Sequence, residues 1–339
     1  MRALFIESPG RASAGQTGAP VLAADEVLLR VRMVGLCGSD LNSYRGRNPL
    51  VSYPRIPGHE ISAEVAELGR DVPAGQFAPG AAVTLSPYSS CGKCPSCRRK
   101  RFNACQFNQT LGVQRDGALT EFIAVPWRKL LSAPGLSVRE LCLVEPLTVG
   151  YHAATRGRVE SSDTVLVLGC GTVGLGAIAA ADHKGARVLA VDVDEKKLAL
   201  ARRAGADEAI NAKSEDLPIR IAQLTDGGPD VVIEAIGIPE TFRSAIEMVA
   251  FTGRVVYIGY AKEHVSYDTR LFVQKELDIL GSRNATEADF AGVIEVLGKH
   301  TFPLEETVSR IVGLADAPAA LADWERDPAA ISKILVEVG

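Results

Sequence analysis

After about residue 150, short apolar segments alternate regularly with amphipathic ones. The apolar segments TVLVLG, RVLAVD and DVVIEAIG have the length of buried strands, and the segments VGLGAIAAADHKG and EKKLALARRAG between them have the apolar spacing of helices. Strands and helices in this alternation form βαβ units, whose strands are parallel. The pattern therefore predicts an α/β fold with a doubly wound parallel sheet.

The first 150 residues have a different character and are rich in predicted strands and turns. Short apolar or alternating segments, separated by glycine and proline, predict strands at Glu26–Met33, Ile61–Leu68, Ala81–Leu85 and Thr120–Val125. A further strand-like segment, ISKILVEV, lies in a tail that is too short to form a domain. We expect this tail to rejoin the first domain, so that the α/β domain interrupts a β-rich one.

The 339 residues are enough for two hydrophobic cores. We place a β-rich domain at residues 1–148, an α/β domain at 149–286 and the return to the first domain at 287–339. The net charge of −4 argues against nucleic acid as a partner. No apolar run is long enough to span a membrane, and the N-terminus lacks the pattern of a signal peptide. These features predict a cytoplasmic protein.

Four cysteines lie in one short segment with the spacing C-x2-C-x2-C-x7-C, namely Cys91, Cys94, Cys97 and Cys105. Four thiolates are what a closed tetrahedral zinc site needs. A pair of disulfides is one alternative, although intracellular thiols stay reduced. An iron–sulfur cluster is another, but the bacterial ferredoxin motif has a shorter last spacer followed by proline. We therefore favour zinc in this lobe, residues 91–105.

A glycine-rich segment, GCGTVG, matches G-x-G-x-x-G between a predicted strand and a predicted helix. Its glycines permit a tight turn, close approach of a pyrophosphate and close helix packing. Asp192 ends the next strand, where a carboxylate binds ribose hydroxyls and repels a 2′-phosphate, so NAD is favoured over NADP. The alternative is an ordinary glycine turn with Asp192 as a helix cap. The candidate cofactor-binding residues are Gly169, Gly171, Thr172, Val173, Gly174, Asp192, Lys197, Ile236 and Ile258.

Three separated segments each offer a metal ligand. Cys37 lies in GLCGSD, His59 and Glu60 lie in PGHE, and Glu145 lies in VEPL. Taken singly, each has an ordinary structural explanation, since a lone cysteine is usually a small buried apolar residue. Together they match a catalytic zinc site, which uses three protein ligands of N, S or O type and keeps one position open.

These motifs carry a family resemblance that extends over most of the chain. The chain resembles the zinc-dependent medium-chain dehydrogenase/reductase family of alcohol and polyol dehydrogenases. Glutamate in the EPL motif, where alcohol dehydrogenases have cysteine, is similar to the sorbitol-dehydrogenase-like members. The resemblance implies a Rossmann domain inserted into a GroES-like catalytic domain. It rests on GLCGSD (35–40), PGHE (57–60), the four-cysteine lobe, EPL (145–147), GCGTVG and Asp192.

The resemblance also implies roles for the candidate ligands. Cys37, His59 and Glu145 would hold the catalytic zinc, with Glu145 bound directly or through water. Glu60 is the nearby carboxylate that can exchange into the metal shell in this family. The cysteines of the lobe would hold a structural zinc, and Cys142 and Cys170 are left as packing residues.

Ser39, two residues after a candidate ligand, can accept or pass the proton of a bound hydroxyl; its alternative is a simple turn residue. The family commonly has a histidine at the end of a proton relay, where this chain has Asn42, an amide that does not titrate near neutral pH. The sequence therefore leaves the end of the relay open.

The segments NPLVSYPRIPGHE, LGVQRDGALTEF and GSRNATEADF resemble bacterial L-galactonate or L-gulonate 5-dehydrogenases, which oxidise a secondary hydroxyl of a sugar acid. Arg283 falls where sorbitol-type enzymes carry a pocket arginine, and a guanidinium there can bind a carboxylate or several hydroxyls. A surface ion pair is its alternative. Further substrate-binding candidates are Tyr44, Gln109, Arg115 and Asn284. The alternative function is a dehydrogenase of a neutral polyol, sugar or secondary alcohol.

Two other classes of protein compete with this interpretation. A non-enzyme, such as a structural protein or nucleotide sensor, would have little reason to keep an open three-ligand site, although fold alone never proves activity. A zinc-free reductase would not need both ligand sets. Family members pair edge strands of their coenzyme sheets into homodimers or homotetramers, and we expect the strand near Val255–Tyr260 and its neighbours to supply that edge.

Overall fold

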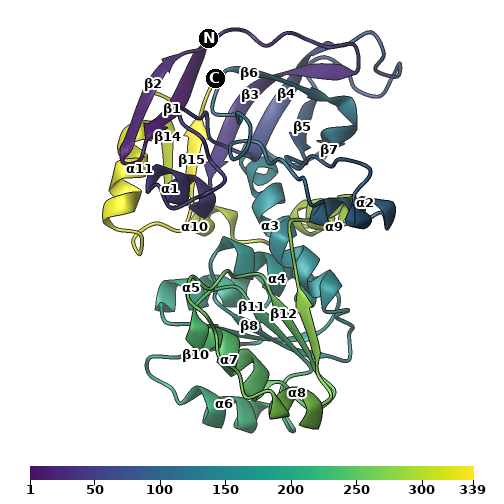
Figure 1. Cartoon of the computed structure of the whole chain (residues 1–339), viewed down its shortest axis with the longest axis vertical. Coiled ribbons are helices and arrows are strands. Elements are labelled where there is room, and N and C mark those ends of the chain that lie inside the picture. Colours follow the sequence, from purple (N-terminus) through teal and green to yellow (C-terminus); the bar gives the residue numbers. More distant parts are fainter. The chain divides into compact units, whose positions relative to one another are not determined.

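The computed structural model describes all residues from Met1 to Gly339. The chain divides into two compact units, coloured along the sequence in Figure 1: unit 1 contains Met1–Glu145 and Leu304–Gly339, and unit 2 contains Pro146–Pro303. Unit 2 thus interrupts unit 1 in sequence. The second boundary lies later than the predicted residue 286, because helix α9 (Glu287–Gly298) packs against α4 (Thr172–His183) of unit 2. None of the helices has the length and apolar character needed to cross a membrane.

Unit 1 is built on a seven-stranded sheet in the order β14-β15-β3-β4-β5-β7, with β6 also paired to β3. The predicted strands of the first domain are present, and β15 pairs antiparallel with β3, so the C-terminal segment does rejoin the first domain. A separate hairpin joins β1 (Arg2–Ser8) to β2 (Arg11–Gln16). The strands of the sheet are β3 (Glu26–Leu36), β4 (Glu60–Leu68), β5 (Ala82–Leu85), β6 (Phe122–Pro126), β7 (Leu130–Ser132), β14 (Arg310–Gly313) and β15 (Ile334–Glu337).

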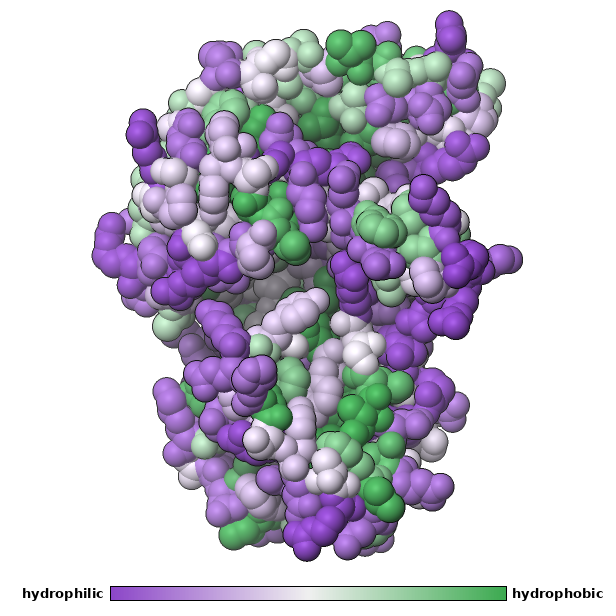
Figure 2. All heavy atoms as spheres, in the orientation of Figure 1, coloured by the Kyte–Doolittle hydropathy of each residue, from purple (hydrophilic) through white to green (hydrophobic).

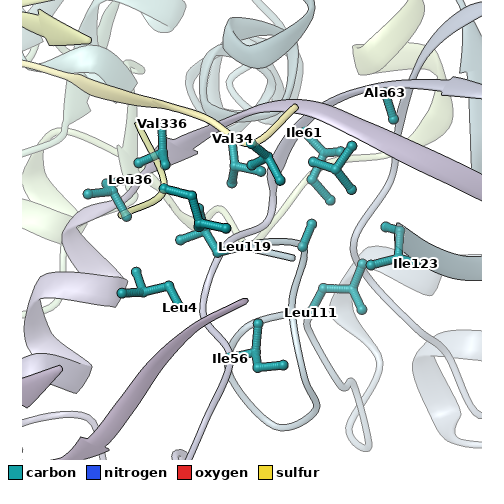
Figure 3. Close-up of a cluster of buried hydrophobic side chains, with 14 of the residues drawn as sticks. Leu4, Val34, Leu36, Ile56, Ile61, Ala63, Leu111, Leu119, Ile123 and Val336 are labelled. Atoms are coloured by element: carbon teal, nitrogen blue, oxygen red, sulfur yellow. The ribbon is translucent and has the colours of Figure 1, made fainter. Parts of the chain in front are cut away.

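The core of unit 1 joins side chains that are distant in sequence. Figure 3 shows Val34 and Leu36 of β3, Ile61 of β4 and Val336 of β15 gathered around Leu119. All five are fully buried, and each such side chain contributes about 1.5–3 kcal/mol to the hydrophobic stabilisation. This packing fixes the ends of β3 and β4, from which the candidate metal ligands project.

The helices of unit 1 are short. They are α1 (Gly38–Tyr44), α2 (Pro95–Arg98), α10 (Leu304–Thr307) and α11 (Ala317–Arg326), with single 3₁₀ turns η1 (Phe102–Ala104) and η2 (Trp127–Lys129). The longer helix α3 (Val138–Arg156) begins in unit 1 and ends in unit 2. It contains Pro146, which lacks the N–H of a normal helical hydrogen bond.

Unit 2 contains six parallel strands in the order β10-β9-β8-β11-β12-β13, which confirms the predicted doubly wound sheet. The strand order reverses between β8 and β11, and ligands of such sheets bind at this switch point. The strands are β8 (Thr164–Leu168), β9 (Arg187–Asp192), β10 (Glu208–Asn211), β11 (Val231–Glu234), β12 (Arg254–Tyr257) and β13 (Asp278–Gly281). The helices are α4, α5 (Glu195–Arg203), α6 (Leu217–Leu224), α7 (Pro239–Met248), α8 (Arg270–Gln274) and α9.

The edge of the unit 2 sheet lies within the region where we expected it. We expected the strand near Val255–Tyr260 and its neighbours to supply this edge; β12 is paired on both sides, and its neighbour β13 is the outer strand. The short segment DILG is more exposed than a typical buried strand, so its sequence gave a weak strand signal. The face of the molecule in Figure 2 is mostly hydrophilic with scattered apolar residues, as expected from the 23% of charged residues.

Candidate metal centre and dinucleotide site

The pairing of β3 with β4 brings two of the predicted ligand segments together. Gly35 near the end of β3 lies opposite Glu60 at the start of β4, so that Cys37 follows one strand and His59 precedes the other. One ligand atom from each of Cys37, His59 and Glu60 lies within 4.8 Å of the others. Two segments that are more than twenty residues apart in sequence thus form one compact group of S, N and O donors.

Glu60 lies in a cradle that only glycine permits. A Cβ atom at Gly35 would lie 2.0 Å from Oε2 of Glu60, far inside van der Waals contact. Lys333, just before β15, donates from Nζ to both carboxylate oxygens of Glu60, at 2.6 and 2.7 Å, and to the carbonyl of Leu36 at 3.3 Å. Both side chains are buried, so this is a fully desolvated ion pair.

Glu145 approaches the same region from helix α3. It is buried, and the hydroxyl of Tyr88 donates a hydrogen bond to its Oε1. Glu145 is not a member of the compact group within 4.8 Å, but its charge acts on both His59 and Tyr88. Burial and the nearby charge of Glu60 raise the pKa of Glu145, although His59 opposes this.

The local charge balance indicates what the group can bind. The carboxylates of Asp40, Glu60 and Glu145 are buried around the thiol of Cys37, and Lys333 is the one permanent cation among them. Burial disfavours a charged His59, yet the Cys37 thiolate and the Asp40 carboxylate raise the pKa of His59 well above its ordinary value. Acidic groups thus outnumber the permanent cation in this region, and a dication with a preference for mixed S, N and O ligands fits the donor set.

Ser39 and Tyr44 both belong to helix α1 but face different surroundings. The Oγ of Ser39 is buried and has no hydrogen-bond partner, as expected of a group kept for a ligand. Tyr44 is packed into the core of unit 1, and its hydroxyl donates to the carbonyl of Gly10 at 2.9 Å. These contacts give Tyr44 a packing role in unit 1, and its contact with substrate stays a prediction.

The four cysteines of the lobe converge without forming disulfides. The sulfurs of Cys94 and Cys97 are 3.4 Å apart and those of Cys94 and Cys105 are 3.9 Å apart. Sulfurs that each lie ~2.3 Å from one tetrahedral zinc would be separated by ~3.8 Å. The Ser96 hydroxyl and backbone amides lower the pKa of Cys94 to about 5, whereas burial raises the pKa of Cys97 to about 11. The lobe thus has the geometry of a tetrathiolate site.

The glycine-rich turn follows β8 and leads into α4. Gly169 has φ of +98°, and a Cβ at Gly174 would lie 1.8 Å from the carbonyl oxygen of Gly169, so both positions require glycine. Asp192 at the end of β9 accepts hydrogen bonds from the backbone of Cys170 at 2.8 Å and of Val193 at 2.7 Å. The turn and the carboxylate are therefore held together at the switch point of the sheet.

The other predicted cofactor residues lie either just after strands of the unit 2 sheet or on helices α4 and α5. Ile236, 44% exposed, follows β11 and lies against Gly169. Ile258 follows β12, and its N–H donates to the carbonyl of Glu234 at 2.9 Å. Lys197 lies on α5 near the thiol of Cys170, whose pKa is raised chiefly by burial. Thr172 and Val173 form the first turn of α4.

The predicted substrate-binding residues are divided between the two units. In unit 1, Arg115 is half-buried and lines a cavity of about 220 Å³ together with Tyr88 and Lys129, while Gln109 is exposed. In unit 2, Arg283 is exposed, and Asn284 has a left-handed backbone with φ of 51°. Each unit thus contributes its own candidates.

Sequence analysis missed two residues of the site, Lys333 and Tyr88. A lysine inside the apolar segment ISKILVEV was the available signal for the first, since an unpaired lysine is rarely buried. Tyr88 lies three positions before Cys91, outside every motif.

Comparison with known proteins agrees with this geometry. Residues 23–135 match the family model of the alcohol dehydrogenase GroES-like domain, and residues 172–299 match that of zinc-binding dehydrogenases. The chain is 32% identical to L-galactonate-5-dehydrogenase of Escherichia coli, over 86% of each chain. It is also 32% identical to a sorbitol dehydrogenase of Halalkalibacterium halodurans, over 83% of this chain and 82% of the relative.

A solved structure agrees over the whole length. The crystal structure of the short chain alcohol dehydrogenase RspB of Escherichia coli CFT073, complexed with NADH, matches with a TM-score of 0.91 and 28% identity, covering 100% of this chain and 99% of that one. The family of the chain follows from both domain models, from the relatives and from the fold. The chain is an oxidoreductase that belongs to the zinc-dependent medium-chain dehydrogenase/reductase family, among its alcohol and polyol dehydrogenases.

Proposed function

We propose that this protein oxidises a secondary hydroxyl of a sugar acid, similar to L-galactonate or L-gulonate, with NAD as hydride acceptor. The observation that supports it most is the buried group of Cys37, His59 and Glu60 with an unpartnered Ser39 hydroxyl beside it. Such an arrangement is suited to holding a metal and a hydroxyl next to each other.

Cys37, His59 and Glu145 would hold a catalytic zinc, with Glu60 as the neighbouring carboxylate, and the lobe cysteines would hold a structural zinc. When bound, the catalytic ion supplies a Lewis acid that favours loss of the proton from a hydroxyl. Ser39 would relay that proton: its unpartnered Oγ would accept it while the serine's own hydroxyl proton passes on towards solvent. The buried carboxylates around the group would help to keep the ion in place, since each adds negative charge next to it.

The preference for NAD is argued from Asp192. Backbone amides hold its carboxylate at the end of β9, beside the glycine turn, where a ribose would lie. A fixed negative charge there favours free hydroxyls over a 2′-phosphate. Asp192→Ala should therefore lower the ratio of kcat/KM with NAD to kcat/KM with NADP. An unchanged ratio would contradict this role of Asp192.

The acid substrate is argued from the arginines and from the relatives. Arg115 lines the cavity beside Tyr88, and Arg283 follows the last strand of unit 2, so each can offer a guanidinium to a carboxylate. The relative named L-galactonate-5-dehydrogenase favours a sugar acid. The relative named sorbitol dehydrogenase favours the second candidate, a neutral polyol.

Initial rates of NAD reduction across a panel of aldonates and polyols decide between the two substrate classes. We expect Arg283→Ala to raise KM for an aldonate at least tenfold, an effect of ~1.4 kcal/mol, and to leave KM for a polyol nearly unchanged. Arg115→Ala is tested in the same way, with the exposed Arg11→Ala as the matched control. Equal effects on both substrate classes would reject carboxylate recognition by these residues.

A further inference from the structure

Tyr88 makes one contact that distinguishes it from the other tyrosines of unit 1. Its hydroxyl donates to the carboxylate of Glu145, and both side chains are buried. The hydroxyls of Tyr44 and Tyr53 instead donate to the backbone carbonyls of Gly10 and Ser43. Tyr88 is therefore the tyrosine of unit 1 whose hydroxyl bonds a candidate metal ligand.

The segment around Tyr88 is anchored on both sides. Nζ of Lys129 donates to the Tyr88 carbonyl at 2.6 Å, and the N–H of Leu111 donates to the carbonyl of Pro87 at 3.1 Å. Tyr88 also forms an antiparallel bridge with Thr110. Because the backbone is fixed, the phenol reaches Glu145 from a defined direction, and the hydrogen bond restricts the rotamers of the carboxylate.

The two carboxylates next to Cys37 and His59 are held in chemically different ways. Glu60 gives both oxygens to the ammonium of Lys333, which neutralises its charge. Glu145 accepts from a neutral phenol, which orients the carboxylate but leaves its charge in place. The Tyr88 bond thus orients its carboxylate without itself neutralising it, whereas the Lys333 bonds neutralise Glu60.

We propose that Tyr88 is a positioning residue that orients Glu145 toward the catalytic metal, while Lys333 keeps Glu60 occupied. The inference rests on the proposed metal site at Cys37, His59 and Glu145. On this view, the hydrogen-bond partners of Glu60 and Glu145 determine which of the two carboxylates binds the metal. Hydrogen-bond partners of metal ligands typically contribute 10- to 100-fold to metal affinity or activity.

The test measures metal binding directly. Wild-type protein and Tyr88→Phe are prepared with zinc in the four-cysteine lobe and titrated with Co²⁺, whose visible d–d absorption reports the ligand geometry. We expect Tyr88→Phe to weaken Co²⁺ binding about tenfold and to change the d–d spectrum. Tyr44→Phe, which also removes one buried hydroxyl of unit 1, should leave Co²⁺ affinity and spectrum as in wild type.

A double-mutant cycle isolates the pair. In a Glu145→Gln background, adding Tyr88→Phe should have no further effect on Co²⁺ affinity, since the orienting contact has lost its carboxylate. The inference would be overturned if Tyr88→Phe bound Co²⁺ with the affinity and spectrum of wild type. It would also be overturned if Tyr88→Phe lowered the Co²⁺ affinity equally in the wild-type and Glu145→Gln proteins. If wild-type protein with a zinc-filled lobe binds no Co²⁺, the proposed function fails as well. Thermal unfolding of the metal-free proteins checks that Tyr88→Phe is folded.

Discussion

At the scale of single residues, the site depends on charges that are buried in pairs. Glu60 and Lys333 are fully desolvated, and the absence of a side chain at Gly35 leaves room for the carboxylate of Glu60. A buried ion pair is a weak source of net stability, but removing one partner leaves an uncompensated charge in a medium of low polarity. The pair therefore shapes the site more than it strengthens the fold.

This argument predicts the outcome of a two-residue cycle. Lys333→Met should lower the free energy of unfolding by about 3–5 kcal/mol, because Glu60 is left buried and unpaired. Adding Glu60→Gln to Lys333→Met should recover most of that loss. Urea unfolding followed by tryptophan fluorescence measures both. If the free energy of unfolding of Lys333→Met lies within about 1 kcal/mol of the wild-type value, the pair contributes no more than an exposed pair does. That result would contradict the interpretation.

The residues that could be predicted from sequence are those whose signal is local. Short motifs contain the lobe cysteines, the glycine turn and Asp192, and the spacing within each motif predicts its local geometry. Lys333 could not be predicted as a partner of Glu60, because the contact joins positions 273 residues apart and depends on the pairing of β15 with β3. The packing of Tyr44 into the core of unit 1 could not be predicted either, because its closeness to a motif in sequence does not show which way its side chain faces.

At the scale of elements, helix α3 is tied to the start of helix α9 within unit 2. Nδ1 of His152 lies 2.7 Å from Oδ2 of Asp289, and Oδ1 accepts from the hydroxyl of Thr155 at 2.9 Å. Asp289 also forms a capping box with Thr286. Burial opposes ionisation, but the bonds from His152 and Thr286 outweigh it and lower the pKa of Asp289.

The lowered pKa gives a pH dependence with a definite sign. Since the folded-state pKa lies below the unfolded one, Asp289 stabilises the fold above about pH 4, the ordinary pKa of Asp, and this contribution is lost as pH falls through the folded pKa. Asp289→Asn should therefore be less stable than wild type at pH 7, with the difference shrinking below pH 4 in thermal melts. Asp268→Asn, which breaks the exposed pair with Arg270, is the control with little expected effect. A pH-independent difference for Asp289→Asn would contradict this linkage.

The four-cysteine lobe predicts a separable effect of metal loss. Its buried side chains are chiefly the cysteines themselves, so its order should depend on the metal they hold. Cys97→Ser should reduce zinc from two ions to one per chain by elemental analysis and increase amide hydrogen exchange over residues 91–108. Cys142→Ser, which alters a buried cysteine outside the lobe, should keep both ions. Unchanged exchange in Cys97→Ser would show that the lobe is ordered without metal.

At the scale of the whole molecule, the free edge of the unit 2 sheet is the feature that invites assembly. The outer edge of β13 carries unpaired backbone groups, and Ile279 on it is 41% exposed. Unprotected edges of this kind pair with another copy. The family resemblance led us to expect homodimers or homotetramers that pair through β12 or its neighbours, and β13 is the neighbour with a free edge.

The register of β13 supplies a clean variant to test this. The N–H groups of Asp278 and Ser282 donate inward to the carbonyls of Gly253 and Tyr257, so the intervening N–H of Ile279 faces the outer edge. Ile279→Pro therefore removes an outward donor without breaking the pairing with β12. We expect it to lower the molecular mass in light scattering from an oligomer to a monomer, with Ile279→Ala as control. A wild-type monomer would contradict the prediction.

The insertion of unit 2 into unit 1 also has a consequence in time. At a typical synthesis rate of roughly 5–20 residues per second, the 273 positions that separate Glu60 from Lys333 take roughly 14–55 s to translate. Throughout that interval the nascent β3–β4 hairpin carries an acidic group whose ammonium partner does not yet exist. The buried ion pair is therefore completed late, when β15 joins β3.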